Sequence, residues 1–210
     1  MKILAVGMNY RKHLLELNNS EPTEPVLFIK PDSALSFASA KTASTNKPFF
    51  LPDFSNEIHY ETEVVVKICK LGKNISAKFA HRYYDEVTVG LDLTARDLQS
   101  KLRKAGMPWE ICKGFDQSAV IGQFQSLEQV GEIQNLDFGL DINGKTVQQG
   151  CTADMIFAVD QVIEYASRFY TLKIGDLIYT GTPSGVGKIY AEDHLEGYLM
   201  GKKILDICVK

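Results

Sequence analysis

The clearest pattern along the chain is a two-residue alternation over residues 58–68 (IHYETEVVVKI). Every second residue from Ile58 to Ile68 is aliphatic, aromatic or β-branched, and the residues between them include Glu61 and Glu63. This period is typical of a β-strand that buries one face. A second strand is predicted over residues 86–92 (EVTVGLD), and it ends at Asp92.

Weaker patterns predict the other elements. Strands are expected at 2–6, at 26–29, in a hairpin over 137–149 that turns at Asn143-Gly144, in LIYTG before a Gly/Pro loop, and at 202–210. Helical spacing is found at 10–18, 76–85, 94–104 and 154–169. Thr94 is expected to cap the third helix, and Thr152 or Asp154 the fourth. Strands predominate without regular alternation, which predicts an α+β fold with a mixed, rolled-up sheet and peripheral helices.

Length and composition narrow the class of protein. The 210 residues fit one domain, 1–210, that can bury a substantial core. A net charge of −3 argues against a nucleic-acid binder, and no run of apolar residues is long enough for a membrane span. The four cysteines are dispersed, without a C-x-x-C pair, and the N-terminal segment is predicted to be a first strand and not a secretory signal. We therefore expect reduced thiols, no zinc site and a cytoplasmic location.

Three carboxylates are the strongest chemical signal. Glu61 and Glu63 are two residues apart on one strand and point the same way, while Asp92 ends the next strand. Like charges side by side need a cation or donors, and an all-oxygen set favours Mg²⁺ or Mn²⁺. Ca²⁺, another hard cation, could replace either ion in a crystal. The alternative is that both glutamates form the solvated face of an edge strand.

Seven strings, in order along nearly the whole chain, resemble the fumarylacetoacetate hydrolase superfamily. They are GMNYRKHLLEL (7–17), PVLFIKP (25–31), IHYETEVVV (58–66), GLDLTARDLQ (90–99), WEICKGFDQSAVIG (109–122), NGKTVQQGCTADMIF (143–157) and GDLIYTGTPSGVG (175–187). The resemblance implies a barrel-like mixed β-roll, a homodimer, and a metal held by Glu61, Glu63 and Asp92. It also implies a loop that closes over the site, for which residues 10–24 are the candidate lid.

The short form of that family, which is similar to acylpyruvate hydrolases and oxaloacetate decarboxylases, implies further site residues. His13 and Glu16 match its catalytic pair, and at i and i+3 they share one face of a helix, so the carboxylate can orient the imidazole. Lys113 matches a lysine that faces the substrate, while Gln99 and Thr182 match substrate-binding positions. The alternatives are solvated side chains at His13, Glu16, Gln99 and Lys113 and a turn residue at Thr182. Arg96 and Asp97 are interpreted as structural.

The resemblance implies a metal-dependent hydrolase that cleaves the C–C bond of 2,4-dioxo acids such as acetylpyruvate or fumarylpyruvate. Decarboxylation of oxaloacetate, or isomerisation of a 2-hydroxymuconate-type substrate, would fit the same residues. A metal-stabilised binding protein with a retired site is the non-enzymatic alternative. Leu91, Thr94 and Leu98 depart from the family pattern beside the metal ligands, which leaves the shape of the substrate open.

Overall fold

The computed structural model describes residues 1–16 and 20–210, and only the backbone at 42–43. The strands are β1 (Ile3–Gly7), β2 (Val26–Lys30), β3 (Leu35–Phe37), β4 (Ile58–Tyr60), β5 (Thr62–Ile68), β6 (Tyr84–Asp92), β7 (Thr94–Ala95), β8 (Ala119–Ile121), β9 (Gln125–Ser126), β10 (Asp137–Ile142), β11 (Lys145–Cys151), β12 (Leu177–Tyr179), β13 (Gly187–Lys188), β14 (His194–Leu199) and β15 (Lys202–Cys208). The helices are α1 (Arg11–Glu16), α2 (Ala77–Ala80), α3 (Arg96–Ala105), α4 (Glu110–Lys113), α5 (Leu127–Val130) and α6 (Val159–Phe169).

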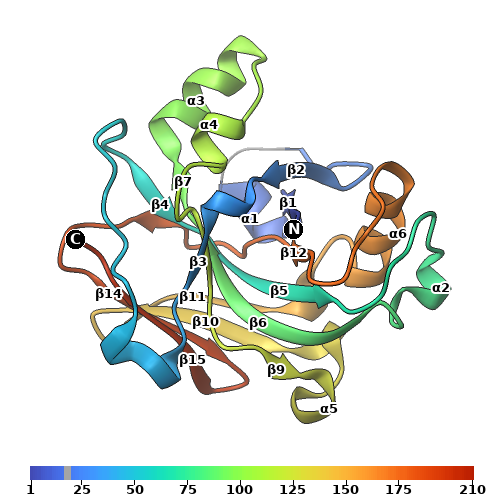
Figure 1. Cartoon of the computed structure of the whole chain (residues 1–210). Helices are drawn as coiled ribbons and strands as arrows, with labels where there is room; N and C mark the ends of the chain where they lie inside the picture. Colours follow the sequence, from blue (N-terminus) through green and yellow to red (C-terminus); the bar gives the residue numbers. More distant parts are fainter. Residues whose placement is uncertain (17–19) are drawn as a thin grey trace.

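The largest sheet is mixed and curls on itself. Its strand order is β2-β1-β12-β5-β6-β8-β3, with β9 paired to β6. The pairs β1–β12 and β3–β8 are parallel, and the others are antiparallel. Its two end strands, β2 and β3, are separated in sequence only by residues 31–34. The sheet must therefore roll until its ends approach each other, which confirms the predicted rolled α+β fold (Figure 1).

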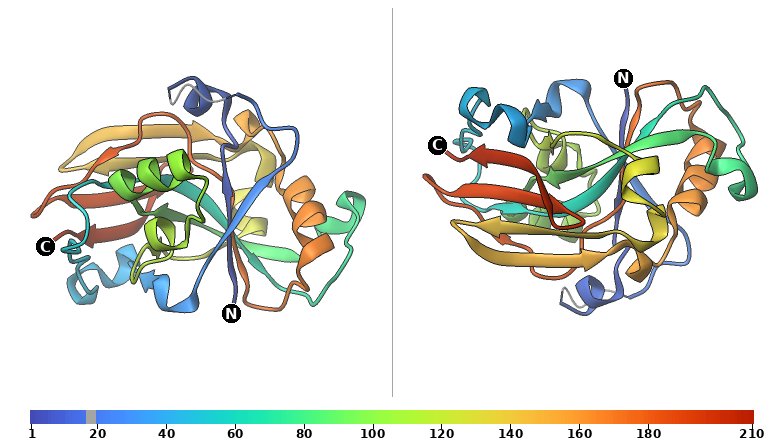
Figure 2. Two further views of the ribbon diagram at one scale, coloured as in Figure 1. Left: turned by 90° about the horizontal axis from the view of Figure 1, so that it is seen from above. Right: turned by 90° about the horizontal axis from the view of Figure 1, so that it is seen from below.

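A second sheet, in the order β11-β10-β14-β15, packs against the first (Figure 2). The core between them contains Val64 and Val66 of β5, Val89 of β6, and Phe138 of β10. These side chains are at most 4% exposed, so the apolar face of β5 packs into this core; Glu63 and Val65 on its opposite face are buried as well. Helix α6 covers the same core at the end of the molecule where α2 lies (Figure 1).

The predicted hairpin over 137–149 is present as β10 and β11. Asn143 and Gly144 both have positive φ (53° and 75°), as a type I′ turn requires. The predicted strand 58–68 is interrupted at Glu61, so that β4 pairs with β7 and β13 in a small third sheet while β5 belongs to the large one. The interruption lies directly at the predicted metal site.

Three helix predictions are wrong in their limits. The helix expected at 76–85 ends at Ala80, because Tyr84 joins strand β6 and its hydroxyl donates to Asp160 at 2.9 Å. Thr94 does not cap α3: its hydroxyl donates to the Asp92 carbonyl at 3.1 Å, and the N-cap is Ala95.

The helix expected at 154–169 starts at Val159. Thr152 is already engaged, since its hydroxyl oxygen accepts from the Leu136 N–H at 2.8 Å, and Thr152–Asp154 forms a separate 3₁₀ turn. The end of the helix predicted at 10–18 lies outside the described residues. In the part of the chain that is described, no helix is long and apolar enough to cross a bilayer.

Candidate active site

The predicted metal ligands meet at the end of the β5–β6 pairing where β5 begins and β6 ends. Glu63 pairs with Gly90 across the two strands, and the Asp92 N–H donates to the Glu61 carbonyl at 2.8 Å. This register puts all three carboxylates on one face of the sheet. One oxygen from each lies within 4.8 Å of the others, and the residues are 5%, 1% and 1% exposed in the order Glu61, Glu63, Asp92.

Gly90 is required by this packing. A Cβ at Gly90 would come within 2.8 Å of Val65 and 2.9 Å of the Tyr179 ring. Both side chains pack closely against Gly90, which faces Glu63 across the two strands. The alternative interpretation of the glutamates as a solvated strand face is therefore excluded by their burial.

Three cationic side chains contact two of the carboxylates. The Lys113 ammonium lies 2.7 Å from Glu61 Oε2 and 2.6 Å from Asp92 Oδ2. Lys30 reaches Asp92 Oδ1 at 2.7 Å, and Arg96 reaches Glu61 Oε1 at 2.5 Å. Burial alone would raise the pKa of Glu61, but Lys113 and Arg96 outweigh it and hold that pKa well below its ordinary value. Burial lowers the pKa of Lys113, but Asp92 and Glu61 outweigh this and raise it, so the side chain stays charged.

Glu63 has a different environment. Its Oε2 accepts from the Gly181 N–H at 2.7 Å, but within the described residues it makes no ion pair. Burial, together with the charges of Asp92 and Glu61, raises its pKa well above the ordinary value. A buried carboxylate without a counter-charge, facing two others at metal-ligand spacing, is what a hard divalent cation would stabilise. The three residues therefore fit the predicted Mg²⁺ or Mn²⁺.

The predicted catalytic pair forms on α1. His13 Nδ1 lies 3.0 Å from Glu16 Oε2, and His13 is only 5% exposed. Because an ionised carboxylate only accepts, the hydrogen of this contact is on Nδ1, and Nε2 is the ring nitrogen that does not contact Glu16. Glu16 also accepts from the Gly185 N–H at 3.1 Å. The carboxylate thus holds the imidazole and ties α1 to the loop after β12.

His13 and the carboxylate centre share a small cavity of about 30 Å³. The polar side chains of its wall are those of His13, Glu61, Arg96, Gln99, Arg103 and Lys113, and Phe28 and Trp109 supply its aromatic part. This volume admits roughly one or two water molecules. The structure therefore brings five of the predicted site residues together at this cavity. His13, Glu61, Gln99 and Lys113 line it, and Glu16 contacts His13 from outside the lining.

Arg96 does more than the sequence interpretation assigned to it. It lines the cavity and donates both to Glu61 and, at 2.5 Å, to Gln99 Oε1. This contact leaves the Gln99 amide NH₂ to donate elsewhere. Asp97 is structural as expected, since it accepts from the Ser55 hydroxyl at 2.6 Å and the Leu98 N–H at 2.8 Å.

Thr182 lies outside the small cavity. It is 4% exposed and follows Gly181, whose N–H contacts Glu63. Its hydroxyl oxygen accepts from Gln148 Nε2 at 2.9 Å. The structure thus places Thr182 beside the metal ligands but not in contact with the His13 cavity.

The sequence interpretation missed Lys30. This lysine is fully buried at the end of β2, and its ammonium also donates to the Ser118 carbonyl at 3.1 Å. Burial lowers its pKa, although Asp92 opposes the shift. In the sequence, Lys30 is recognisable only as a lysine that ends the apolar run VLFI. This pattern suggests that Lys30 is buried, but it does not reveal that its partner is Asp92. Lys30 reaches Asp92 because the curled sheet brings β2 back towards β6.

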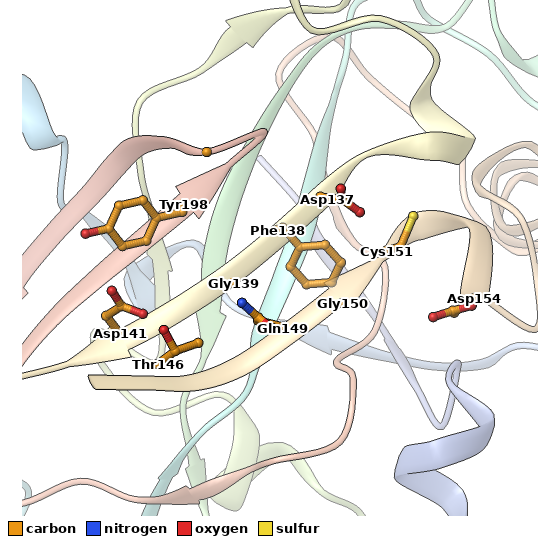
Figure 3. A pocket seen from close by; sticks show the side chains of 11 residues that line it. Asp137, Phe138, Gly139, Asp141, Thr146, Gln149, Gly150, Cys151, Asp154 and Tyr198 are labelled. Atoms are coloured by element: carbon orange, nitrogen blue, oxygen red, sulfur yellow. The ribbon is translucent and has the colours of Figure 1, made fainter. Parts of the chain in front are cut away.

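A second cavity and a second group of possible metal ligands lie apart from this site. A cavity of about 570 Å³ on the outer face of β10 and β11 is lined by Asp137, Asp141, Thr146, Gln149 and Tyr198, among others, and by none of the predicted site residues (Figure 3). The side chains of His194, Glu196 and Asp206 also lie at metal-ligand spacing. There, the Lys203 ammonium already contacts both Glu196 and Asp206 at 2.8 Å.

Comparison with known proteins shows which family the chain is similar to. The fumarylacetoacetate (FAA) hydrolase C-terminal family matches residues 2–206. The oxaloacetate tautomerase of Escherichia coli (strain K12) is 39% identical over 209 residues, 97% of this chain and 92% of that protein. The mitochondrial oxaloacetate decarboxylase of Dictyostelium discoideum is 40% identical over 188 residues, 90% of this chain and 84% of that protein.

A solved structure of the same shape contains a metal ion. The fumarylpyruvate hydrolase of Pseudomonas aeruginosa, in complex with Mn²⁺ and pyruvate, has a TM-score of 0.92 and 35% sequence identity, over 100% of this chain and 89% of that one. The chain therefore belongs to the fumarylacetoacetate hydrolase family of enzymes. The predicted resemblance and the predicted fold are both confirmed.

Proposed function

We propose that the chain is a Mg²⁺- or Mn²⁺-dependent enzyme that interconverts the keto and enol forms of a small 2-oxo acid, with oxaloacetate as the expected substrate. The observation that carries the proposal is the His13–Glu16 pair at the wall of a cavity whose other polar groups include Lys113, Arg96 and Gln99. A base faces cations and amide donors there. That combination suits the movement of a proton next to a carbonyl whose oxygen becomes negatively charged.

Glu61, Glu63 and Asp92 would hold the metal, which when bound supplies Lewis-acid polarisation of the substrate's C2 oxygen. His13 Nε2 takes a proton from C3, the electron pair forms the C2=C3 bond, and the negative charge moves to the C2 oxygen. The Lys113 ammonium stabilises that charge, and the imidazolium returns the proton to the oxygen to give the enol. Gln99 and Arg96 orient the substrate by donating to its oxygens. The name of the Escherichia coli relative supports this choice of substrate.

Hydrolysis of an acylpyruvate is the second candidate. The cavity beside His13 has room for a water molecule, and the Pseudomonas relative is a fumarylpyruvate hydrolase bound to pyruvate. His13 would take a proton from that water, and the hydroxide would add to C4. Breaking C3–C4 then leaves a carboxylic acid and the enolate of pyruvate, which is protonated at C3.

The test follows each reaction separately with purified protein and Mg²⁺ or Mn²⁺. Conversion of enol to keto oxaloacetate is followed by the loss of enol absorbance, while CO₂ release is measured in parallel. Acetylpyruvate and fumarylpyruvate are assayed by their own absorbance. We expect oxaloacetate tautomerisation to be accelerated well beyond its rate with the metal ion alone. A rate equal to that background would exclude the tautomerase, and no turnover of any substrate would favour a binding protein.

A further inference from the structure

Gln148 makes an unusual set of contacts between the two sheets. It belongs to β11, the edge strand of the second sheet, yet it is only 2% exposed. The pairing of β10 with β11 shifts at this point: Leu140 pairs with Gln148, and Asp141 pairs with Thr146. The extra residue, Val147, makes a β-bulge, and bulges re-aim side chains. Gln148 therefore points towards the candidate active site, whereas its neighbour Gln149 lines the outer cavity (Figure 3).

The contacts of Gln148 fix the direction of its amide. Oε1 accepts from the Thr62 N–H at 2.9 Å, and Nε2 donates to the Pro183 carbonyl and to Thr182 Oγ1, both at 2.9 Å. A backbone N–H can only donate and a carbonyl can only accept, so the amide cannot be reversed. The Thr182 hydroxyl oxygen must then be the acceptor from Gln148.

This arrangement determines what the Thr182 hydroxyl can do. With its oxygen engaged by an amide N–H, the hydroxyl still has its own proton to donate. Among the described residues, the acceptor within its reach is the Pro183 carbonyl, at 3.5 Å, which already accepts from Gln148. A contact of that length is at the limit of a hydrogen bond. The hydroxyl is therefore left with a proton to donate to a ligand.

Gln148 also connects the segment of Glu61 and Glu63 with the segment of Thr182. Thr62 lies between Glu61 and Glu63, and Gly181, next to Thr182, donates to Glu63 at 2.7 Å. Gln148 and Glu63 thus bridge the same two segments. We propose that Gln148 is a positioning residue that holds the Thr182 hydroxyl as a hydrogen-bond donor to the carboxylate of a 2-oxo acid. This inference rests on the proposed function, because it presumes that such an acid binds beside Glu63.

The test measures pyruvate binding by calorimetry on Mn²⁺-loaded protein, so that turnover is not needed. We expect Gln148→Met to weaken pyruvate binding about 10-fold, as for the loss of a hydrogen bond to a charged group. Thr182→Val should cause a similar loss, and the double variant should be no weaker than Thr182→Val alone, because Gln148 acts through the hydroxyl. Gln149→Met, on the outer face of the same strand, should change binding less than about 2-fold.

Gln148→Glu keeps the acceptor for the Thr62 N–H, so it tests the proposal if Gln148→Met does not fold. Its carboxylate would draw the Thr182 hydroxyl proton away from the ligand, and pyruvate should again bind at least 10-fold more weakly. Normal pyruvate binding by the folded Gln148 variants would overturn the role of Gln148, and so would losses that multiply in the double variant. Neither outcome would contradict the proposed substrate class. If the wild-type protein binds no pyruvate, the proposed substrate class fails, and this inference fails with it.

Discussion

Asp92 is held by two lysines, one on each carboxylate oxygen, whereas Glu63 contacts no lysine among the described residues. Lys30 contacts Oδ1 at 2.7 Å and Lys113 contacts Oδ2 at 2.6 Å. Removal of one member of a buried ion pair leaves the other as an uncompensated charge. The three metal-ligand candidates should therefore differ in what they contribute to the protein without metal.

Two variants separate these contributions. Glu63→Gln removes a buried carboxylate that makes no ion pair within the described part of the chain, so the metal-free protein should keep its stability or gain some. Asp92→Asn leaves Lys30 and Lys113 short of a counter-charge and should cost about 3–5 kcal/mol of unfolding free energy. Both should lose Mn²⁺ binding. Denaturant unfolding after chelation and Mn²⁺ calorimetry measure the two effects, and equal destabilisation would contradict the assignment.

A substitution of His13 distinguishes the reactions. Tautomerisation and acylpyruvate hydrolysis both need a base, so His13→Ala should slow them by about 10²–10⁴-fold. Decarboxylation of oxaloacetate needs chiefly the metal and the charge of Lys113, and it should fall much less. His81→Ala, at the exposed end of α2, is the control. Equal losses in all three reactions, with Mn²⁺ still bound, would mean that His13 positions the substrate and is not the base.

Among the elements, α1 is the one expected to act as a lid over the site. One wall of the cavity of about 30 Å³ is His13 on α1, so a movement of α1 would change the space available to a substrate. So short a helix depends on tertiary contacts. Here these contacts are the buried side chain of Leu14 and the Glu16–Gly185 hydrogen bond. The lid over residues 10–24 stays a prediction, and its residues 17–19 lie outside the part of the chain that is described.

Hydrogen exchange tests the lid. The Leu14 N–H donates to the Tyr10 carbonyl at 3.0 Å, so its exchange reports the opening of α1. We expect fast exchange in the free protein and slower exchange when oxalate and Mg²⁺ bind together. The Val66 amide in the central strand β5 should exchange slowly in both states. Slow exchange at Leu14 that oxalate and Mg²⁺ leave unchanged would contradict a mobile lid.

The strands β14 and β15 are linked by Asp206, which contacts His194 at 2.9 Å and Lys203 at 2.8 Å. Burial would raise the pKa of Asp206, but Lys203 and His194 outweigh it and lower the pKa. Asp206→Asn should therefore cost about 1 kcal/mol at neutral pH, because Lys203 is partly solvated. The folded pKa is below the unfolded value, so this difference should persist above pH 3.8 and vanish as the pH falls through the lower folded pKa. A difference that grows in acid would contradict the pairing.

For the molecule as a whole, local sequence patterns predicted the positions of residues that are set by their own strand or by the next strand along the chain. Alternation placed Glu61 and Glu63 on one face, and the next strand along the chain brought Asp92 to them. Lys30 and Gln148 could not be placed in this way. Lys30 needs the closure of the rolled sheet, and Gln148 needs a bulge in β11 and the packing of a second sheet. The limits of the helices failed for the same reason, since tertiary contacts of Tyr84 and Thr152 decided them.

Metal removal tests the centre at the scale of the whole molecule. The core between the two sheets and α6 does not include the three carboxylates, so the chelated protein should remain folded and unfold cooperatively. A cation that binds only the folded state stabilises it by about 2.7 kcal/mol at 100 times its Kd. For a domain of this size that is a rise in Tm of roughly 5–11 °C. Thermal unfolding at increasing Mn²⁺ should show this rise in the wild type and not in Glu63→Gln. A chain that unfolds on chelation would mean that the ion is part of the fold, and an equal rise in both proteins would place the cation elsewhere.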